Sequence, residues 1–121
     1  MDASLLTVSQ HTTAQGVHVL TPHGEIDHSS VAFAGWAFDS GAGDRCAPCT
    51  VVDFEHVTFM DSSGLHFLLY AYLAAQESDG WIRLANVPPA VQRLLRIVGL
   101  DELLPTYATL QAALPPEIVA P

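Results

Sequence analysis

Residues 50–85 constrain the fold of this chain more than any other stretch, because a strand pattern, a helix pattern and a second strand pattern follow one another there. Residues 50–54 and 81–85 are rich in β-branched, aromatic and aliphatic residues, as is typical of buried strands. Between them, apolar residues recur at spacings of three and four, which predicts an amphipathic helix. This apolar stripe consists of Leu65, Leu68, Leu69, Tyr72 and Leu73. A strand–helix–strand crossover of this length predicts two parallel strands in an α/β fold.

The predicted helix is preceded by the polar turn Asp61-Ser62-Ser63-Gly64. The first amides of a helix have no partner within it, and short polar side chains can accept hydrogen bonds from them. We therefore expect Ser62 or Ser63 to cap the helix. Such a helix start suits an oxyanion or a phosphate, although the same residues would also suffice as a good cap without any ligand.

The N-terminal part of the chain predicts an antiparallel hairpin followed by a helix. Residues 4–9 and 16–21 have strand-like composition, and the polar residues 10–15 connect them. Pro22 and residues 24–27 have turn chemistry, so we expect the second strand to end there. A helix is then predicted from one of the caps at 27–30 to about Phe38, with its nearly uncharged apolar face buried.

The C-terminal part predicts a further helix, a short strand and a last short helix. Pro88-Pro89 opens the first of these helices, and Gly99 ends it. Its expected buried stripe is Val91, Leu94, Leu95 and Val98. Residues 103–107 are predicted as a short strand broken by Pro105, and residues 108–114 as the last helix.

Length and charge restrict the domain organisation and the partners. A chain of 121 residues fits one domain, which we place at residues 1–114, with residues 115–121 as a flexible tail. The formal net charge of −9, with four arginines and no lysine, opposes binding to nucleic acid or to anionic membranes. The N-terminus has no signal-peptide pattern and residues 67–75 are too short to span a membrane, so we expect a cytoplasmic protein.

Several kinds of catalytic or cofactor site are disfavoured by what the sequence lacks. A serine nucleophile elbow would need a glycine where Met60 stands, and the only histidine after Ser62 is His66, one helical turn away. The six histidines show no metal-ligand spacing, and no phosphate-binding glycine loop ends in Gly-Lys-Ser/Thr, so we expect no cofactor. Cys46 and Cys49 have redox-motif spacing, but they precede a strand and are interpreted as incidental, reduced cysteines. A serine that is phosphorylated by an external kinase remains compatible with these absences.

Three segments together resemble a known family: Gly24-Glu25-Ile26-Asp27, residues 52–65 with Phe59-Met60-Asp61-Ser62-Ser63-Gly64-Leu65, and residues 89–95 with Gly99-Leu100. The chain closely resembles the anti-sigma factor antagonists, which are single STAS domains. The resemblance spans nearly the whole chain, and the segment around Asp61-Ser62-Ser63-Gly64 is its most specific part.

The resemblance implies a mixed sheet of four to five strands, the first of them antiparallel, with about four helices packed mainly on one face. It also implies a non-enzymatic regulator that binds an anti-sigma factor, itself a serine kinase, and thereby frees a sigma factor. Phosphorylation by that kinase, with ATP, would reverse the binding, and a phosphatase would reset the cycle. The family's phosphoserine falls on Ser62. The implied partner-binding residues are Asp27, Asp61, Ser62, Ser63 and Gly64.

The sequence departs from the family pattern at Cys46-Ala47-Pro48-Cys49 and at Pro88, which replaces a serine that often caps the later helix. Two alternatives to the phosphoswitch stay open. One is a constitutive interaction or scaffold domain in a sensory complex, with the serine serving merely as a cap. The other is a redox-gated switch that uses Cys46 and Cys49. The oligomeric state is also left open by the sequence.

Overall fold

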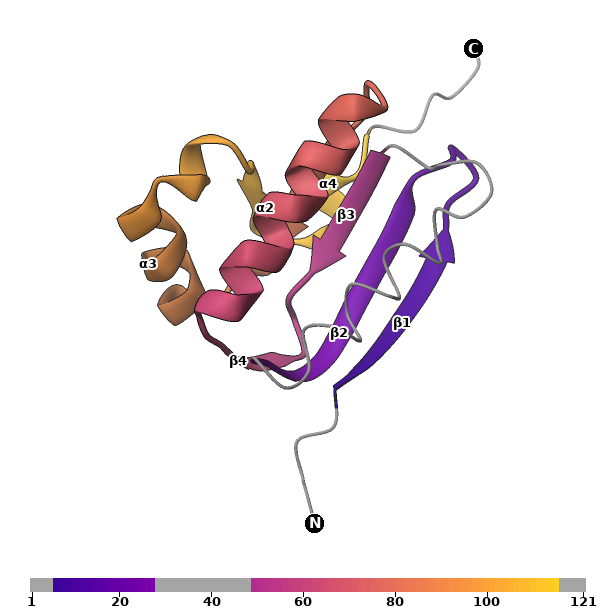
Figure 1. Cartoon of the computed structure of the whole chain (residues 1–121). Coiled ribbons are helices and arrows are strands. Elements are labelled where there is room, and N and C mark those ends of the chain that lie inside the picture. The colour runs from indigo at the N-terminus through magenta and orange to yellow at the C-terminus, as the bar shows by residue number, and fades with distance from the viewer. Residues whose placement is uncertain (1–5, 28–48, 116–121) are drawn as a thin grey trace.

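The computed structural model describes residues 6–27 and 49–115. The elements of these two ranges, shown in Figure 1, are β1 (Thr7–Thr12), β2 (His18–Ile26), β3 (Cys49–Asp53), β4 (Val57–Met60), α2 (Ser62–Glu77), β5 (Trp81–Ala85), α3 (Pro89–Val98), the 3₁₀ helix η1 (Leu100–Glu102), β6 (Thr106–Tyr107) and α4 (Leu110–Ala113).

The strands form one mixed sheet in the order β1-β2-β3-β5-β6, with β4 paired to β2. β1 and β2 are antiparallel, and the other pairs are parallel. The crossover from β3 through α2 to β5 brings Cys49 opposite Trp81 and Asp53 opposite Ala85. This arrangement confirms the predicted α/β class, the antiparallel start and the parallel crossover.

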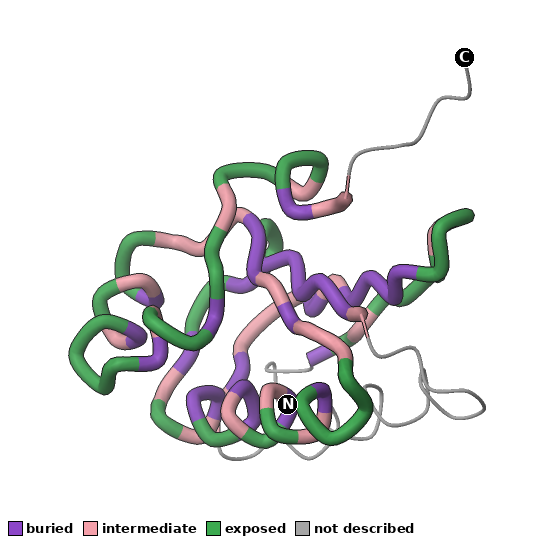
Figure 2. Tube along the Cα trace, turned by 90° about the horizontal axis from the view of Figure 1, so that it is seen from above, coloured by how far each residue is buried: buried purple, intermediate pink, exposed green. Residues whose placement is uncertain are grey.

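Helices cover both faces of the sheet, with the longer ones on the same face. Because side chains alternate along a strand, Val52 faces the large core under α2 and α3, whereas Val51 faces a small core that includes Ala113 of α4. Figure 2 shows the sheet between α2 and α4, with buried residues lining the inner side of α2. The described residues contain three α-helices, where about four were expected; the helix predicted at 27–38 lies outside the described ranges.

Two sequence predictions at the centre of the sheet are wrong. Gly24-Glu25-Ile26 is not a turn, because β2 continues to Ile26 and its last residues pair with β4. β4 was not predicted either, although it occupies residues Val57–Met60 between the predicted strand at 50–54 and α2. In the structure the chain turns after Phe54, whose carbonyl accepts from the Val57 amide at 3.0 Å, and then pairs with β2 again.

Within residues 49–115 the predicted helices are present, with some differences in their extent and in their exposed faces. Asp79-Gly80 follows the end of α2, and Gly99 ends α3 with a φ of 82°. Within the predicted stripes, Leu65, Leu68, Val91 and Leu95 are buried, but Leu73 and Val98 are 52% and 53% exposed. The last strand and the last helix are shorter than predicted, and Leu103 lies between η1 and β6 rather than in a strand.

Candidate functional site

The predicted site lies where β4 ends and α2 begins, and its cap is Asp61. The Asp61 carboxylate accepts a hydrogen bond from the Ser63 amide at 2.8 Å, and the Asp61 carbonyl accepts from the Gly64 amide at 3.0 Å. The expectation that Ser62 or Ser63 caps the helix is therefore wrong. Asp61 precedes the helix with an extended backbone, which is the usual conformation of a capping residue, whereas both serines are already helical.

Ser62 is thus the first residue of α2, and its side chain is exposed, while Ser63 is half-buried. Because Asp61 supplies the cap, the helix does not require the Ser62 hydroxyl. The hydroxyl stands at the positive end of the α2 dipole, where a negatively charged group is stabilised.

Gly64 allows α2 to start close to the sheet. A side chain at this position would place its Cβ 3.1 Å from Cγ2 of Ile26 and closer still to Cγ and Sδ of Met60. Both neighbours lie at the ends of paired strands, since Ile26 of β2 is opposite Met60 of β4. The first turn of α2 can therefore lie this close to the strand ends only because residue 64 has no side chain.

The same strand pair brings Asp27 to the site. Asp27 and Asp61 each follow one member of the pair Ile26 and Met60, and the Asp61 amide donates to the Ile26 carbonyl at 3.2 Å. Both aspartates are half-buried. All five predicted partner-binding residues consequently gather at the carboxyl ends of β2 and β4.

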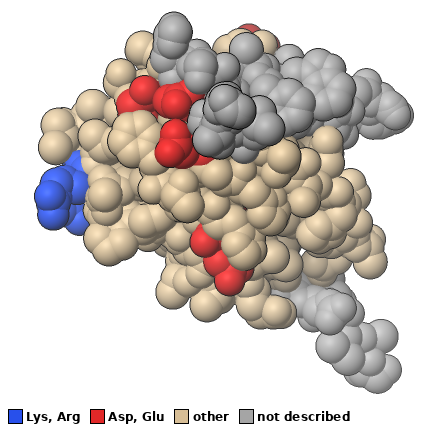
Figure 3. Space-filling model, turned by 90° about the horizontal axis from the view of Figure 1, so that it is seen from below, with Lys and Arg blue, Asp and Glu red and all other residues tan. Residues whose placement is uncertain are grey.

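The charged side chains around the site are mainly acidic. Seen from the side on which β4 and the start of α2 lie, acidic side chains are prominent and basic ones appear at one edge, where α3 lies (Figure 3). The exposed bases of α3 are Arg93 and Arg96. An acidic surface of this kind favours a partner with a basic face.

A small groove adjoins Ser62 on the side of α3. It has a volume of about 260 Å³ and is lined by Ser62, Leu65, His66, Leu69, Val98 and Leu100. Leu100 belongs to the Gly99-Leu100 pair of the family resemblance, but its place next to Ser62 was not predicted. Val98 was assigned to the core. The one signal in the sequence was an apolar residue directly before the glycine that stops the helix.

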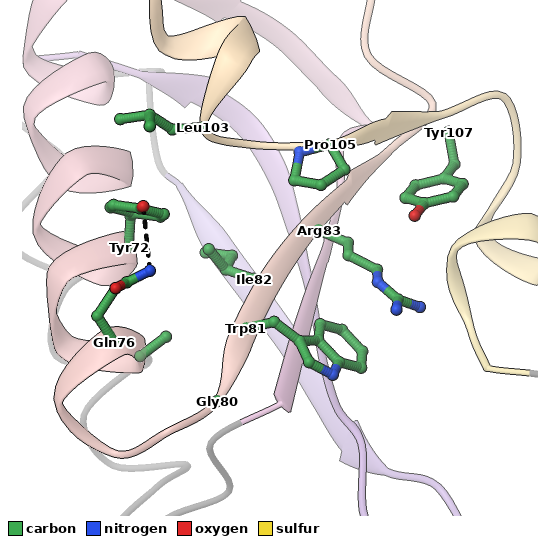
Figure 4. Close-up of a pocket in the computed structure, with 10 residues that line it drawn as sticks. Tyr72, Gln76, Gly80, Trp81, Ile82, Arg83, Leu103, Pro105 and Tyr107 are labelled. Carbon is green, nitrogen blue, oxygen red and sulfur yellow. Dashed lines mark hydrogen bonds between the residues drawn. The ribbon is translucent and has the colours of Figure 1, made fainter.

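A second cavity, of about 310 Å³, lies near the other end of α2. In Figure 4, Ile82 of β5 points toward Tyr72 and Gln76 of α2, whereas Trp81 and Arg83 extend away from α2. The Arg83 guanidinium lies 3.9 Å from the centroid of the Trp81 ring and donates to the Ala113 carbonyl at 2.8 Å. These contacts tie α4 to the sheet. The α2 residues that line the cavity lie about 20 Å along the helix from Ser62.

The described residues provide no further support for a metal site, a cysteine pair or a membrane span. Residues 6–27 and 49–115 contain no group of three or more histidine, cysteine or acidic side chains placed to hold a metal ion. Cys49 is a half-buried free cysteine at the start of β3, and Cys46 lies outside the described residues. None of the helices in the described part of the chain has the length and apolar character that crossing a bilayer requires.

Comparisons with known proteins agree with this architecture. Residues 9–113 match the STAS domain family. The chain is 31% identical over 93 residues to a protein of Paenibacillus polymyxa named anti-sigma F factor antagonist, covering 77% of this chain and 80% of the relative. The crystal structure of an anti-sigma factor antagonist from Mycobacterium paratuberculosis is 29% identical, with a TM-score of 0.80 over 90% of this chain and 91% of that one.

A second similar structure is that of the Bacillus cell fate determinant SpoIIAA in its phosphorylated form. It is 22% identical to this chain, with a TM-score of 0.71 over 88% of this chain and 96% of that one. At this level of identity, the structural similarity shows the fold alone. Because the family match spans both parts of the described structure and includes the strand ends and the start of α2, the chain belongs to the STAS domain family.

Proposed function

We propose that this chain is an anti-sigma factor antagonist whose binding is controlled by phosphorylation of Ser62. Without phosphate, it binds an anti-sigma factor that is also a serine kinase, and the sigma factor is freed. With phosphate on Ser62, it is released from that partner. The proposal rests chiefly on one observation, an exposed serine directly after the capping Asp61, in a chain that is 31% identical to a named anti-sigma F factor antagonist.

In the proposed reaction this chain supplies only the acceptor. The Ser62 Oγ attacks the γ-phosphorus of ATP held by the kinase, the bond between that phosphorus and the bridging oxygen breaks, and ADP leaves. The hydroxyl proton passes to a base on the kinase. A phosphatase later hydrolyses the phosphoester and restores the hydroxyl. We expect this cycle to take place in the cytoplasm.

The geometry supports a change in binding without a change in fold. Phosphorylation adds about −1.5 to −2 charges. The dipole of α2 stabilises such a charge at its start, whereas Asp61 and the neighbouring Asp27 repel it. The repulsion and the added volume both act at the exposed surface, so the partner's contact is affected more than the core.

The first test is phosphorylation by a purified anti-sigma kinase from the same organism, with ATP. Intact-mass spectrometry should show the addition of one phosphate, and peptide mapping should place it on Ser62. Ser62→Ala should abolish the addition, whereas the neighbouring Ser63→Ala should retain it. Phosphate on Ser63 alone, or no phosphate from a kinase that binds the chain, would contradict the proposal.

The scaffold alternative assigns the serine a structural role, and the structure gives that role to Asp61 instead. Binding measurements still distinguish the two functions. An antagonist controlled at Ser62 should bind its anti-sigma factor more weakly as Ser62→Asp than as wild type, whereas a constitutive scaffold should bind equally well in both forms.

A further inference from the structure

We propose that the groove between α2 and α3 receives an apolar side chain of the anti-sigma factor, with basic residues of the same partner beside it. This inference rests on the proposed function and identifies the part of the surface that the phosphate controls. The groove borders Ser62 directly, so that an occupant and a phosphate on Ser62 would lie at the same edge.

The composition and size of the groove fit a side chain. Four of its six lining residues are aliphatic: Leu65, Leu69, Val98 and Leu100. Ser62 and His66 are exposed at the start of α2 and supply its polar border. Its volume of about 260 Å³ lies below the range of about 300–1,000 Å³ that is usual for small-molecule sites.

The apolar surface continues from the groove onto the end of α3. Val91 and Leu95 of α3 are buried, but Val98, which continues the same apolar stripe, is 53% exposed and lines the groove. Next to it, Ile97 is 72% exposed and does not line the groove. Val98 is therefore the exposed aliphatic residue of α3 that a side chain in the groove would contact, whereas Ile97 lies outside it.

The charges next to the groove indicate the chemistry of the occupant. Asp61 directly precedes Ser62, and Asp101 and Glu102 directly follow Leu100, so acidic residues adjoin lining residues in sequence. The exposed bases of α3, Arg93 and Arg96, lie five and two residues before Val98 and adjoin no lining residue in sequence. The net charge of the chain is −9. An apolar side chain flanked by lysine or arginine therefore complements both the groove and the charges beside it.

Phosphorylation would act on this contact through hydration as well as repulsion. A phosphate on Ser62 is a strongly hydrated dianion, and the insertion of an apolar group beside it would remove part of that hydration. If the partner's apolar side chain stayed outside the groove, it would lose its contact with Val98 and Leu69. Phosphorylation of Ser62 thus weakens binding because the partner's apolar side chain can no longer be buried in the groove without cost.

The test compares two neighbouring substitutions of equal charge in the full chain. Val98→Asp changes a lining residue, whereas Ile97→Asp changes a more exposed residue on the same helical turn. The probe is the purified anti-sigma kinase that phosphorylates Ser62, and its affinity for the unphosphorylated chain is measured by calorimetry. Val98→Asp should weaken binding by about tenfold or more, and Ile97→Asp by less than about threefold.

A second pair of variants carries no added charge and is less disruptive to folding. Threonine is nearly the same size as valine, but a partner bound in the groove would bury its hydroxyl. Val98→Thr should therefore weaken binding by about fivefold, while Ile97→Thr should have little effect. Circular dichroism verifies that each variant is folded. Equal affinities for the Val98 and Ile97 variants would overturn the groove assignment, even if phosphorylation of Ser62 still releases the partner. A wild-type chain that binds no anti-sigma factor would instead contradict the proposed function.

Discussion

Gly64 is the residue at which the local geometry of the site has the clearest energetic consequence. In a helix, alanine is favoured over glycine by about 1 kcal/mol, so Gly64→Ala would stabilise an isolated helix. In this fold the added methyl group would meet Ile26 at 3.1 Å and would collide with the middle of the Met60 side chain. Overpacking of a buried site costs about 1–3 kcal/mol.

We therefore expect Gly64→Ala to lower the free energy of unfolding by about 1 kcal/mol, measured by urea denaturation. Ser62→Ala is the matched control, because it places alanine in the same turn on an exposed position and should change stability by less than about 0.5 kcal/mol. A Gly64→Ala protein at least as stable as wild type would show that Met60 and Ile26 yield to the methyl group without cost.

Asp61 allows its capping role to be separated from its charge. Asp61→Ala removes the acceptor of the Ser63 amide and should lower the free energy of unfolding by about 1 kcal/mol. Asp61→Asn keeps a side-chain oxygen at the same position and should retain most of that stability. If urea denaturation gives equal losses for both variants, the carboxylate stabilises the fold through its charge rather than through the cap.

At the scale of elements, the sequence predicted what local patterns determine. The α2 stripe and the Pro88-Pro89 helix start have strong signals of their own, and both helices formed as predicted. β4 has four residues, and its pairing with Gly24–Ile26 depends on a partner far away in the chain. Pro22 suggested a turn, yet it lies in the part of β2 between the stretches paired to β3 and β4, where a missing N–H is tolerated.

The candidate site likewise has one part that the sequence predicted and one part that it did not. Asp61, Ser62, Ser63 and Gly64 are contiguous, and the family resemblance distinguished Ser62 from Ser63. The groove required the structure, because Val98 and Leu100 come close to Ser62 only when α2, α3 and η1 are assembled around one core. Apolar periodicity assigned Val98 to the core, since a sequence pattern cannot distinguish a helix face that is buried in the domain from one that is left for a partner.

For the molecule as a whole, the buried His18 makes stability depend on pH. His18 is 2% exposed at the start of β2, and its Nε2 lies 2.9 Å from Oε1 of Gln10. Its Nδ1 is buried and has no hydrogen-bond partner among the residues that the structure describes. Burial, with a smaller contribution from the nearby His11, lowers the pKa of His18 below its ordinary value of 6.5. The unfolded chain therefore binds a proton at a higher pH than the folded chain does.

At a pH well above 6.5, the ordinary pKa of histidine, His18 therefore causes no loss of stability. As the pH falls below that value toward the lowered pKa of His18, the loss of stability grows. Each unit of pKa difference corresponds to about 1.4 kcal/mol. We expect His18→Gln, which can still bond to Gln10, to flatten the decrease in the free energy of unfolding between about pH 7.5 and about pH 5.5. His66→Gln is the control, because His66 is exposed on α2 and its removal should leave the decrease unchanged. Urea denaturation at several pH values measures all three proteins, and equal slopes for wild type and His18→Gln would show that other groups cause the pH dependence.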